Sequence, residues 1–248
     1  MTPDSVNRYA RHLVLKEIGG PGQQALLAAR IVIVGAGGLG GPAGLYLAAA
    51  GIGQITIIDD DTVETSNLQR QVQFTSRDIG KQKAAIMAAR LGEINPDVKT
   101  HAITARLTAE NADSLLQNAD IIIDGVDDFN TRFAINEACL RLDVPLVSGA
   151  LGRFNGQVSV FNTDSASPCY RCLVPDIPPD TETCAAVGVI GALAGVIGSV
   201  MAMEVVKLIT GAGQSLAGRL WLYDGLAAQS RTITLPKDPA CPACRANE

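Results

Sequence analysis

The residues that most directly suggest chemistry are three glycines, Gly35, Gly37 and Gly40, in the spacing G-x-G-x-x-G. They follow an apolar run, 31–34, that is typical of a buried parallel strand, and they precede an Ala- and Leu-rich segment that favours a helix. A second apolar run ends at Asp59. In this arrangement glycines let the backbone approach phosphates, the helix N-terminus offers N–H groups, and the acid accepts hydrogen bonds from ribose hydroxyls. The segment predicts a nucleotide site, but the loop alone leaves the nucleotide and its reaction open.

Charged residues after this loop favour a nucleotide that is a substrate, such as ATP, over a nicotinamide cofactor that carries hydride. Asp59 and Asp127 each follow a predicted strand, and ligands of open α/β sheets bind where such strands end. Arg70 and Lys83 come soon after Asp59 and are expected to fold over the same crevice. Two cations neutralise a phosphate under attack, and a carboxylate such as Asp127 can hold Mg²⁺. No hydride-transfer site is visible, so an ATP-using enzyme is favoured, although each charge taken singly is also typical of a solvated surface.

Four of the cysteines form two C-x-x-C pairs, Cys169-Tyr-Arg-Cys172 and Cys241-Pro-Ala-Cys244. Two such pairs complete a tetrahedral four-sulfur site for one zinc ion, which would tie the C-terminal tail to the middle of the chain. Disulfides and a redox pair are the alternatives. The N-terminal stretch is polar and shows no export signal, which argues against stable disulfides. Neither pair opens a helix after a strand, as a thioredoxin-like redox pair does.

The remaining two cysteines differ in their surroundings. Cys139 falls within a predicted helix and is expected to be an inert core thiol. Cys184 directly precedes a long apolar stretch that is predicted to be helical, and a thiol at a helix N-terminus has a lowered pKa. Cys184 is therefore a candidate nucleophile, with an incidental thiol as the alternative.

Strands that alternate with helices would position these residues. The expected strands are 31–34, 54–58, 98–103, 120–124 and 145–149, and the helices between them are 39–50, 80–94, 108–118 and 129–142. Helices 7–17 and 23–30 are expected before them, and after them strand 157–161, a polar loop at 174–183, helix 185–203 and strands 220–223 and 230–235. The pattern predicts a Rossmann-like, doubly wound, mostly parallel α/β sheet with N-terminal helices, a C-terminal antiparallel extension and a four-cysteine zinc site.

Composition limits the partners. The chain has 248 residues, 47% of them hydrophobic, and a net charge of −5, which argues against nonspecific nucleic-acid binding. The uncharged stretch 185–203 is long enough to test as a membrane span. Its many Ala and Gly residues make it weakly hydrophobic, and it continues in helical register into Glu204 and Lys207, so a buried helix is predicted. We expect a cytoplasmic protein without nucleic-acid or membrane partners.

Taken together, the motifs resemble the MoeB/ThiF family, the bacterial relatives of ubiquitin-activating enzymes. The resemblance covers nearly the whole chain, and the motifs occur in the family's order: Arg8-Tyr9-x-Arg11, the glycine loop, Asp59-x-Asp61, Ser66-Asn67-Leu68-Gln69-Arg70-Gln71, Lys83 and the two C-x-x-C pairs. It implies a single adenylation domain over residues 1–248. Its parts would be N-terminal helices (1–30), a nucleotide-binding core (31–150) and a carrier-binding, zinc-bearing part (151–248).

The resemblance also implies a reaction. The enzyme would bind Mg-ATP and the Gly-Gly C-terminus of a small ubiquitin-like sulfur carrier. The carrier's terminal carboxylate would attack the α-phosphate, giving a carrier acyl-adenylate and pyrophosphate ahead of thiocarboxylate formation. A MoaD-like carrier of molybdopterin biosynthesis is the first expectation, and a ThiS-like carrier for thiamine or a tRNA-thiolation carrier is the alternative. No sulfurtransferase domain follows Cys244, so the sulfur donor is expected to be a separate protein.

The site residues are implied by the same resemblance. Those implied at the ATP site are Gly35, Gly37, Gly38, Gly40, Asp59, Asp61, Ser66, Asn67, Leu68, Gln69, Arg70, Lys83, Asp127 and Asp128. Among them Asp59 would hold the ribose, Gly38 would contact phosphate, and Asp127 would lie at the metal or the α-phosphate. Arg11 would reach the phosphates bound by the partner subunit of a homodimer. One structural zinc per chain would be held by Cys169, Cys172, Cys241 and Cys244.

Three positions qualify the resemblance. Asp128 stands where the family often has asparagine, and His12 stands where glutamine is usual. Cys184 matches a cysteine that links to the activated carrier in ThiF-type members but is not needed for adenylation in MoeB-type members, so it does not choose the pathway. Two alternatives of other classes stay open: an NAD-dependent oxidoreductase, supported by the glycine loop alone, and a catalytically silent, zinc-stapled binding module.

Overall fold

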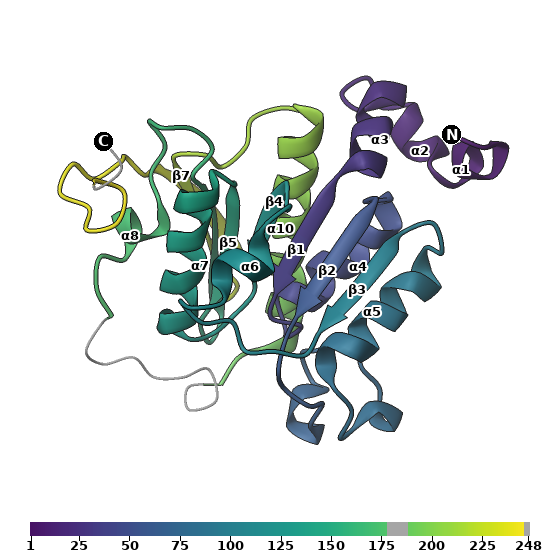
Figure 1. Cartoon of the computed structure of the whole chain (residues 1–248), viewed down its shortest axis with the longest axis horizontal. Coiled ribbons are helices and arrows are strands. Elements are labelled where there is room, and N and C mark those ends of the chain that lie inside the picture. The colour runs from purple at the N-terminus through teal and green to yellow at the C-terminus, as the bar shows by residue number, and fades with distance from the viewer. Residues whose placement is uncertain (178–187, 246–248) are drawn as a thin grey trace.

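One eight-stranded sheet, in the order β3-β2-β1-β4-β5-β6-β7-β8, organises the computed structural model, which describes residues 1–177 and 188–245 (Figure 1). The strands are β1 (Arg30–Val34), β2 (Gln54–Ile58), β3 (Lys99–Ile103), β4 (Ile121–Asp124), β5 (Leu146–Leu151), β6 (Asn155–Phe161), β7 (Arg219–Asp224) and β8 (Gln229–Thr234). The first five strands are parallel, and β6, β7 and β8 continue the sheet in antiparallel fashion. The predicted fold class is confirmed.

The parallel half of the sheet explains where a ligand would sit. β1 lies at its centre, with β2 and β3 on one side and β4 and β5 on the other. Its residues 31–34 are buried, as a strand covered on both faces requires. The order of the strands reverses between β1 and β4, and at such a point the loops after the two strands diverge and leave a crevice.

Helices cover both faces of this half (Figure 1). On one face lie α3 (Gly19–Ala28), α4 (Gly40–Ala50), α5 (Lys83–Ile94) and α10 (Gly191–Thr210). On the other lie α6 (Ala112–Leu116) and α7 (Phe129–Leu142), beside the short α8 (Tyr170–Leu173). Each face is closed by its own hydrophobic cluster, so the sheet is buried between two layers of helices.

The helix α10 is the one helix in the described ranges whose length and composition would suit a membrane span. It packs instead on α4 and on β5 and β6, where Leu193, Ile197 and Met201 are buried. Gly198 permits this packing, since an added Cβ there would lie 2.7 Å from the Leu39 carbonyl oxygen of the facing segment. One face of the helix is buried as predicted, whereas Val196 and Met203 on another face are exposed.

Several predicted bounds need correction near the N-terminus. The predicted helix 7–17 is two short helices, α1 (Pro3–Arg8) and α2 (Ala10–Leu13), that break at Tyr9. Tyr9 is buried, and its hydroxyl accepts a hydrogen bond of 2.8 Å from the Asn95 side chain, so a tertiary contact overrides local helix propensity. The predicted helix 23–30 begins earlier, at Gly19, and ends at Ala28, because Arg30 already belongs to β1.

Other corrections concern helix starts. The predicted helix 80–94 begins at Lys83, since Gly80 has a φ of +83° and Gln82 pairs with Thr62 in an isolated bridge. The predicted helix 108–118 is shorter and begins at Ala112. Before it, the Asn111 side-chain oxygen accepts a hydrogen bond of 2.8 Å from the Thr108 N–H, which forms a turn. The predicted helix 185–203 begins only at Gly191, because Ile190 has an extended backbone and Gly188 a φ of +77°, and it runs on to Thr210. Cys184 and most of the predicted loop 174–183 lie outside the described residues.

Candidate functional site

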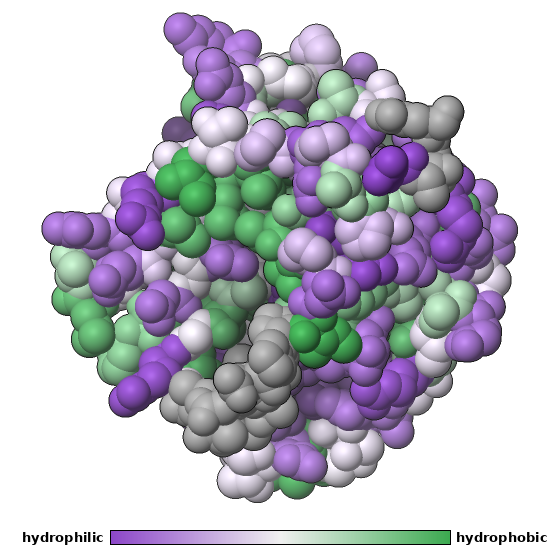
Figure 2. Space-filling model, turned by 90° about the vertical axis from the view of Figure 1, so that its left-hand side faces the viewer, coloured by the Kyte–Doolittle hydropathy of each residue, from purple (hydrophilic) through white to green (hydrophobic). Residues whose placement is uncertain are grey.

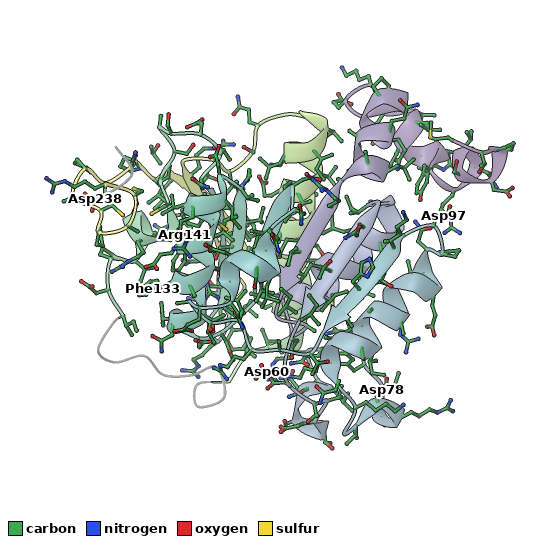
Figure 3. All side chains as sticks on the ribbon, in the orientation of Figure 1. Asp60, Asp78, Asp97, Phe133, Arg141 and Asp238 are labelled. Atoms are coloured by element: carbon green, nitrogen blue, oxygen red, sulfur yellow. The ribbon has the colours of Figure 1, made fainter. Side chains whose placement is uncertain are left out.

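A cleft of about 530 Å³ opens at the carboxyl ends of β1, β2 and β4, at the point where the strand order reverses. Of the predicted ATP-site residues, those that line it are Gly35, Gly37, Gly38, Asp59, Asp61, Arg70, Lys83, Asp127 and Asp128. Figure 3 labels Asp60 at this edge of the sheet and Asp97 at the opposite side, near the N-terminal helices. The strand-end rule therefore brought together residues from the segments that follow β1, β2 and β4.

The glycine loop follows β1 and forms one wall of the cleft. Gly35 has a φ of +91°, and an added Cβ would lie 2.9 Å from the Gly125 carbonyl carbon and oxygen. An added Cβ on Gly40 would lie 1.9 Å from the Gly35 carbonyl oxygen. Gly40 does not line the cleft but closes the turn that starts α4. The glycines thus permit a backbone path that no larger residue allows, and the path exposes main chain to the cleft.

Asp59 ends β2 and faces the glycine loop. Its carboxylate accepts hydrogen bonds from the backbone N–H of Ala36 at 2.7 Å and of Asp61 at 2.8 Å. Burial raises the pKa of the Asp59 carboxyl above its ordinary value, although these two N–H groups and Lys83 pull it down. The two N–H donors fix the orientation of the carboxylate, and its remaining lone pairs can accept hydrogen bonds from ribose hydroxyls.

Lys83 brings a buried positive charge to the same wall. Its side chain is 8% exposed, and its Nζ lies 2.8 Å from Asp61 Oδ2. The backbone N–H of Lys83 also donates to the Asp61 carbonyl oxygen at 2.9 Å. Asp61 is itself well exposed. Because the ammonium group stands at the start of α5 with one exposed partner, it can turn to a phosphate that enters the cleft.

Arg70 stands opposite, beside the glycine loop. Its guanidinium donates to the Ser66 carbonyl oxygen at 3.0 Å, and its Cγ would lie 3.7 Å from a Cβ on Gly38. Ser66 and Asn67 belong to a one-turn helix, Thr65–Asn67, that Glu64 and Asn67 cap reciprocally. The four residues 66–69 do not line the cleft. They lie next to it and position Arg70 through the hydrogen bond to the Ser66 carbonyl.

The loop after β4 carries Asp127 and Asp128, two acids predicted to belong to the ATP site. Asp127 is exposed to the cleft, and within the described ranges its carboxylate has no hydrogen bond or ion pair. Asp128 Oδ1 caps α7 by accepting the Thr131 N–H at 2.8 Å. An asparagine oxygen makes the same bond, so the Asp128 departure preserves the helix cap.

A buried ion pair beneath this loop was missed by the sequence analysis. The Arg132 guanidinium donates to the Val126 carbonyl at 2.6 Å and to the Gly149 carbonyl at 2.8 Å, and it lies 3.4 Å from Asp124 Oδ2. The Ser148 hydroxyl donates to the same Asp124 oxygen at 2.7 Å. Burial raises the pKa of Asp124, against the opposing pull of Arg132. The only signal in the sequence is a charged residue on the apolar side of a predicted helix.

Other residues that line the cleft were not predicted to do so, among them Arg132 of this ion pair, Arg106, Gln71 and Tyr170. Arg106 follows β3 and lies 3.8 Å from Asp128 Oδ2, so the strand-end rule applied to β3 would have found it. Gln71 lines the cleft, is buried and leaves its Oε1 without a partner in the described part of the chain. Tyr170, between two of the cysteines, also lines it, and the Arg132 Cζ lies 5.7 Å from its ring centroid.

Arg11 and Cys184 stand apart from this cleft. Arg11 is exposed on α2 and does not line the cleft, and the N-terminal helices lie toward the opposite end of the sheet (Figure 3). The arginine therefore cannot serve its own cleft, and its predicted role in a partner subunit's site stays a prediction. Cys184 lies outside the described residues.

The four cysteines of the C-x-x-C pairs form one cluster. Sγ–Sγ distances are 3.5 Å for Cys169–Cys241, 4.0 Å for Cys169–Cys172 and 3.6 Å for Cys172–Cys244. Four thiolates about 2.3 Å from a tetrahedral zinc ion would lie roughly 3.8 Å apart. Burial and neighbouring thiols raise the pKa of Cys169 to about 11, so a cation is needed to hold it as a thiolate. The cluster fits a metal of zinc's size and preference.

Comparisons with known proteins agree with this geometry. A sequence model of the ThiF family matches residues 9–243. The chain is 45% identical, over 98% of its length and 92% of the relative's, to a sulfur carrier protein adenylyltransferase of Thermus thermophilus. It is 41% identical, over 96% of its length and 94% of the relative's, to the sulfur carrier protein ThiS adenylyltransferase of Escherichia coli.

Two further comparisons extend this picture. The chain is 44% identical to a probable adenylyltransferase/sulfurtransferase MoeZ of Mycobacterium tuberculosis, over 98% of its own length and 63% of that relative. Among solved structures, E. coli MccB with ATP superposes with a TM-score of 0.84 at 23% identity, over 96% of this chain and 75% of that one. This structural likeness supports the fold.

Proposed function

We propose a reaction for the cleft from the premise that the chain belongs to the ThiF family, whose model matches residues 9–243. The protein is an adenylyltransferase, as its relatives are. In our proposal it activates the C-terminal glycine of a ubiquitin-like sulfur carrier with Mg-ATP. The observation that supports this most directly is the cleft, where the glycine loop, Arg70, Lys83 and Asp127 face one volume, and where Asp127 has no hydrogen bond or ion pair among the described residues.

ATP would lie along the glycine loop. Asp59 would accept hydrogen bonds from the ribose, since its carboxylate is oriented by two backbone N–H groups. The loop would cradle phosphate with main-chain N–H groups at the start of α4. Arg70 and Lys83 would flank the phosphates and stabilise the charge that develops on them.

The chemical step is a substitution at phosphorus. An oxygen of the carrier's terminal carboxylate forms a bond to the α-phosphorus, and the bond from that phosphorus to the oxygen bridging to the β-phosphate breaks. Carrier acyl-adenylate and pyrophosphate are the products. The carboxylates of Asp59, Asp60 and Asp61, which lie together, and that of Asp127 across the cleft would offer the hard oxygen ligands that Mg²⁺ prefers, and bound Mg²⁺ would neutralise phosphate charge.

A second groove suggests how the carrier reaches the phosphates. It has a volume of about 730 Å³, lies over β5–β8 and shares Ala150, Leu151 and Gln157 with the ATP cleft. Two glycines, Gly152 and Gly156, also line it, so a narrow chain can lie close to the backbone there. Figure 2 shows hydrophobic residues gathered between hydrophilic areas on one side of the molecule. We infer that the Gly-Gly tail enters through this groove.

The carrier's identity is the finer part of the proposal. We favour a MoaD-like carrier for molybdopterin biosynthesis, with a ThiS-like or a tRNA-thiolation carrier as the alternative. Pyrophosphate exchange into ATP, measured with each of these carriers, tests both levels. Exchange that depends on one carrier would identify the pathway. If no Gly-Gly-tailed carrier supports exchange, the adenylation proposal is wrong and a silent binding module becomes the better description.

The remaining partners follow from the same premise. We propose one adenylation domain, a cytoplasmic homodimer in which Arg11 reaches the partner's site, and a separate sulfur donor. Cys184 is dispensable for adenylation in this proposal, so Cys184→Ser should leave pyrophosphate exchange intact. For zinc, elemental analysis should find about one ion per chain, and Cys169→Ser should lose it. Metal content well below one per chain in freshly purified protein would contradict the structural zinc site.

A further inference from the structure

Gln73 is a buried polar residue behind the glycine loop that the proposed reaction does not use. It is 2% exposed and does not line the ATP cleft. Its Nε2 donates to the carbonyl oxygens of Ala36 at 2.6 Å and of Gly37 at 3.1 Å. One side-chain amide therefore holds two successive carbonyls of the loop from the side away from the cleft.

These two bonds help to decide where the loop's N–H groups point. In the described part of the chain Gln73 is the donor to the Ala36 carbonyl, whereas the Gly37 carbonyl also accepts the Gly41 N–H at 3.0 Å as α4 begins. A trans peptide is planar, so its N–H is directed opposite to its C=O. With the carbonyls of Ala36 and Gly37 held toward Gln73, the N–H groups of Gly37 and Gly38 are turned the other way. Both glycines line the cleft, and neither N–H has a hydrogen-bond acceptor among the described residues. They are the kind of paired backbone donors that bind an anion.

The surroundings of Gln73 argue for a specific fit. The Oε1 of Gln73 is buried without a partner in the described part of the chain, which disfavours a polar residue here on stability grounds alone. An added Cβ on Gly41 would lie 2.2 Å from this Oε1, so the space for the amide exists because residue 41 is glycine. The Ala36 N–H is meanwhile held by Asp59, so Ala36 is fixed by hydrogen bonds on both sides.

We propose that Gln73 is a positioning residue that sets the peptide orientation of the glycine loop, so that the Gly37 and Gly38 N–H groups bind a phosphate of ATP. This inference rests on the proposed ATP site. Gln73 touches no substrate itself. It acts through the Ala36 and Gly37 carbonyls. Its loss should therefore weaken only the binding of the phosphates of ATP, which meet the loop.

The test compares a nucleotide with phosphates to one without them. In Gln73→Leu the loop loses both bonds, and ATP affinity should fall about tenfold, the size of one net hydrogen bond of about 1.4 kcal/mol. Affinity for adenosine, read by competition with ATP, should stay within about twofold, because adenosine makes no phosphate contact. A merely structural loss would weaken both ligands alike and would overturn the inference, as would unchanged ATP affinity.

Two additional variants keep the test decisive. Gln73→Met removes the donors with little change in volume and serves if the leucine variant fails to fold. Asn162→Gly is the matched control, because the Asn162 amide also donates to two carbonyls, those of Cys139 at 2.8 Å and Val144 at 3.1 Å. Asn162 has a φ of +55°, which glycine adopts readily, and it does not line the cleft. The control should lose stability and keep the ratio of ATP to adenosine affinity.

A spectroscopic measurement separates this inference from the proposed function. In the wild-type protein the ¹⁵N–¹H signals of Gly37 and Gly38 should shift on ATP addition, and in Gln73→Met the shifts should be smaller at saturation. Shifts of equal size would overturn the positioning role while leaving ATP binding intact. A wild-type protein that binds no ATP would overturn both.

Discussion

Two aspartates at the end of β4 have opposite surroundings. Asp124 is 1% exposed and is held by Arg132 and Ser148, whereas Asp127, on the following loop, faces the cleft with no hydrogen bond or ion pair in the described ranges. The cluster of Asp124, Arg132 and Ser148 has its charges paired before any ligand arrives. In the cleft, Asp127 keeps its charge available, and Lys83 has only the exposed Asp61 as its ion-pair partner in the described ranges. The same residue type thus serves architecture where its hydrogen bonds are satisfied and chemistry where they are not.

The largest effect should come from breaking the buried cluster. Arg132→Met leaves Asp124 buried without its cation and frees the Val126 and Gly149 carbonyls, so we expect a loss of about 3–5 kcal/mol in unfolding free energy. Urea denaturation measures it. Arg141→Met is the matched control, because Arg141 lies on the same helix in an exposed ion pair with Asp113 at 2.7 Å. That pair should contribute about 1 kcal/mol or less. Equal losses in the two variants would contradict the comparison.

The next effect should appear in activity alone. Asp127→Ala should lower carrier-dependent pyrophosphate exchange by a factor on the order of 10²–10³, because a group aimed at the reacting phosphates is lost. Its unfolding free energy should change by roughly 0.5 kcal/mol or less, as for other exposed sites without partners. A variant that keeps exchange within a few-fold of wild type, or that unfolds as easily as Arg132→Met, would remove the distinction between the two aspartates.

A pH titration should separate binding from stability at Asp59. Burial raises the pKa of the Asp59 carboxyl, so the folded state binds this proton more tightly than the unfolded chain. The stability contributed by that proton is complete below the unfolded pKa of about 3.9 and is lost as pH rises through the folded pKa. ATP affinity should show the opposite pH dependence. It should fall as acidification protonates the Asp59 carboxylate, and the fall should begin at a pH above the ordinary pKa of an aspartate. Other carboxyls, such as those of Asp78 and Asp113, have lowered pKa values and lose stability on acidification, so the measure is the difference between wild type and Asp59→Asn. The unfolding free energy of the wild type should gain on that of Asp59→Asn as pH falls, and a difference that does not change with pH would refute the assignment.

The smallest effect concerns Asp128, which caps α7 and also lines the cleft. Asp128→Asn keeps an oxygen for the Thr131 N–H and should change the unfolding free energy by about 0.5 kcal/mol or less, whereas Asp128→Ala should cost about 1 kcal/mol. Thermal unfolding of both variants gives the difference. If the asparagine variant is as unstable as the alanine variant, the charge of Asp128, and its ion pair with Arg106, matters more than the helix cap.

The sequence predicted those parts of the site that follow from local patterns. Glycine spacing, an acid at the end of a strand and paired cysteines each carry their geometry within a few residues, and the structure brings Asp59, Lys83 and Arg70 to one cleft as expected. The four cysteine sulfurs lie within 4.8 Å of one another, also as expected.

What the sequence did not predict depends on contacts between distant segments. Arg132 contacts Asp124 and Ser148 only once β4, β5 and α7 have packed together. The residues next to Arg132 in the sequence do not indicate these partners. The break at Tyr9 comes from Asn95, far along the chain. The role of Gln73 emerges only when its amide is seen against the glycine loop. Periodicity describes a helix face, but it does not say which polar residue on that face meets another.

Tyr170 has a consequence that crosses the molecule. It lies between Cys169 and Cys172, its ring packs under the Arg132 guanidinium, and it lines the ATP cleft. The cysteine cluster and the cleft therefore share one neighbouring side chain, through which binding at one site could affect the other. Linkage is reciprocal, so the factor by which bound metal changes ATP affinity is the factor by which ATP changes metal affinity.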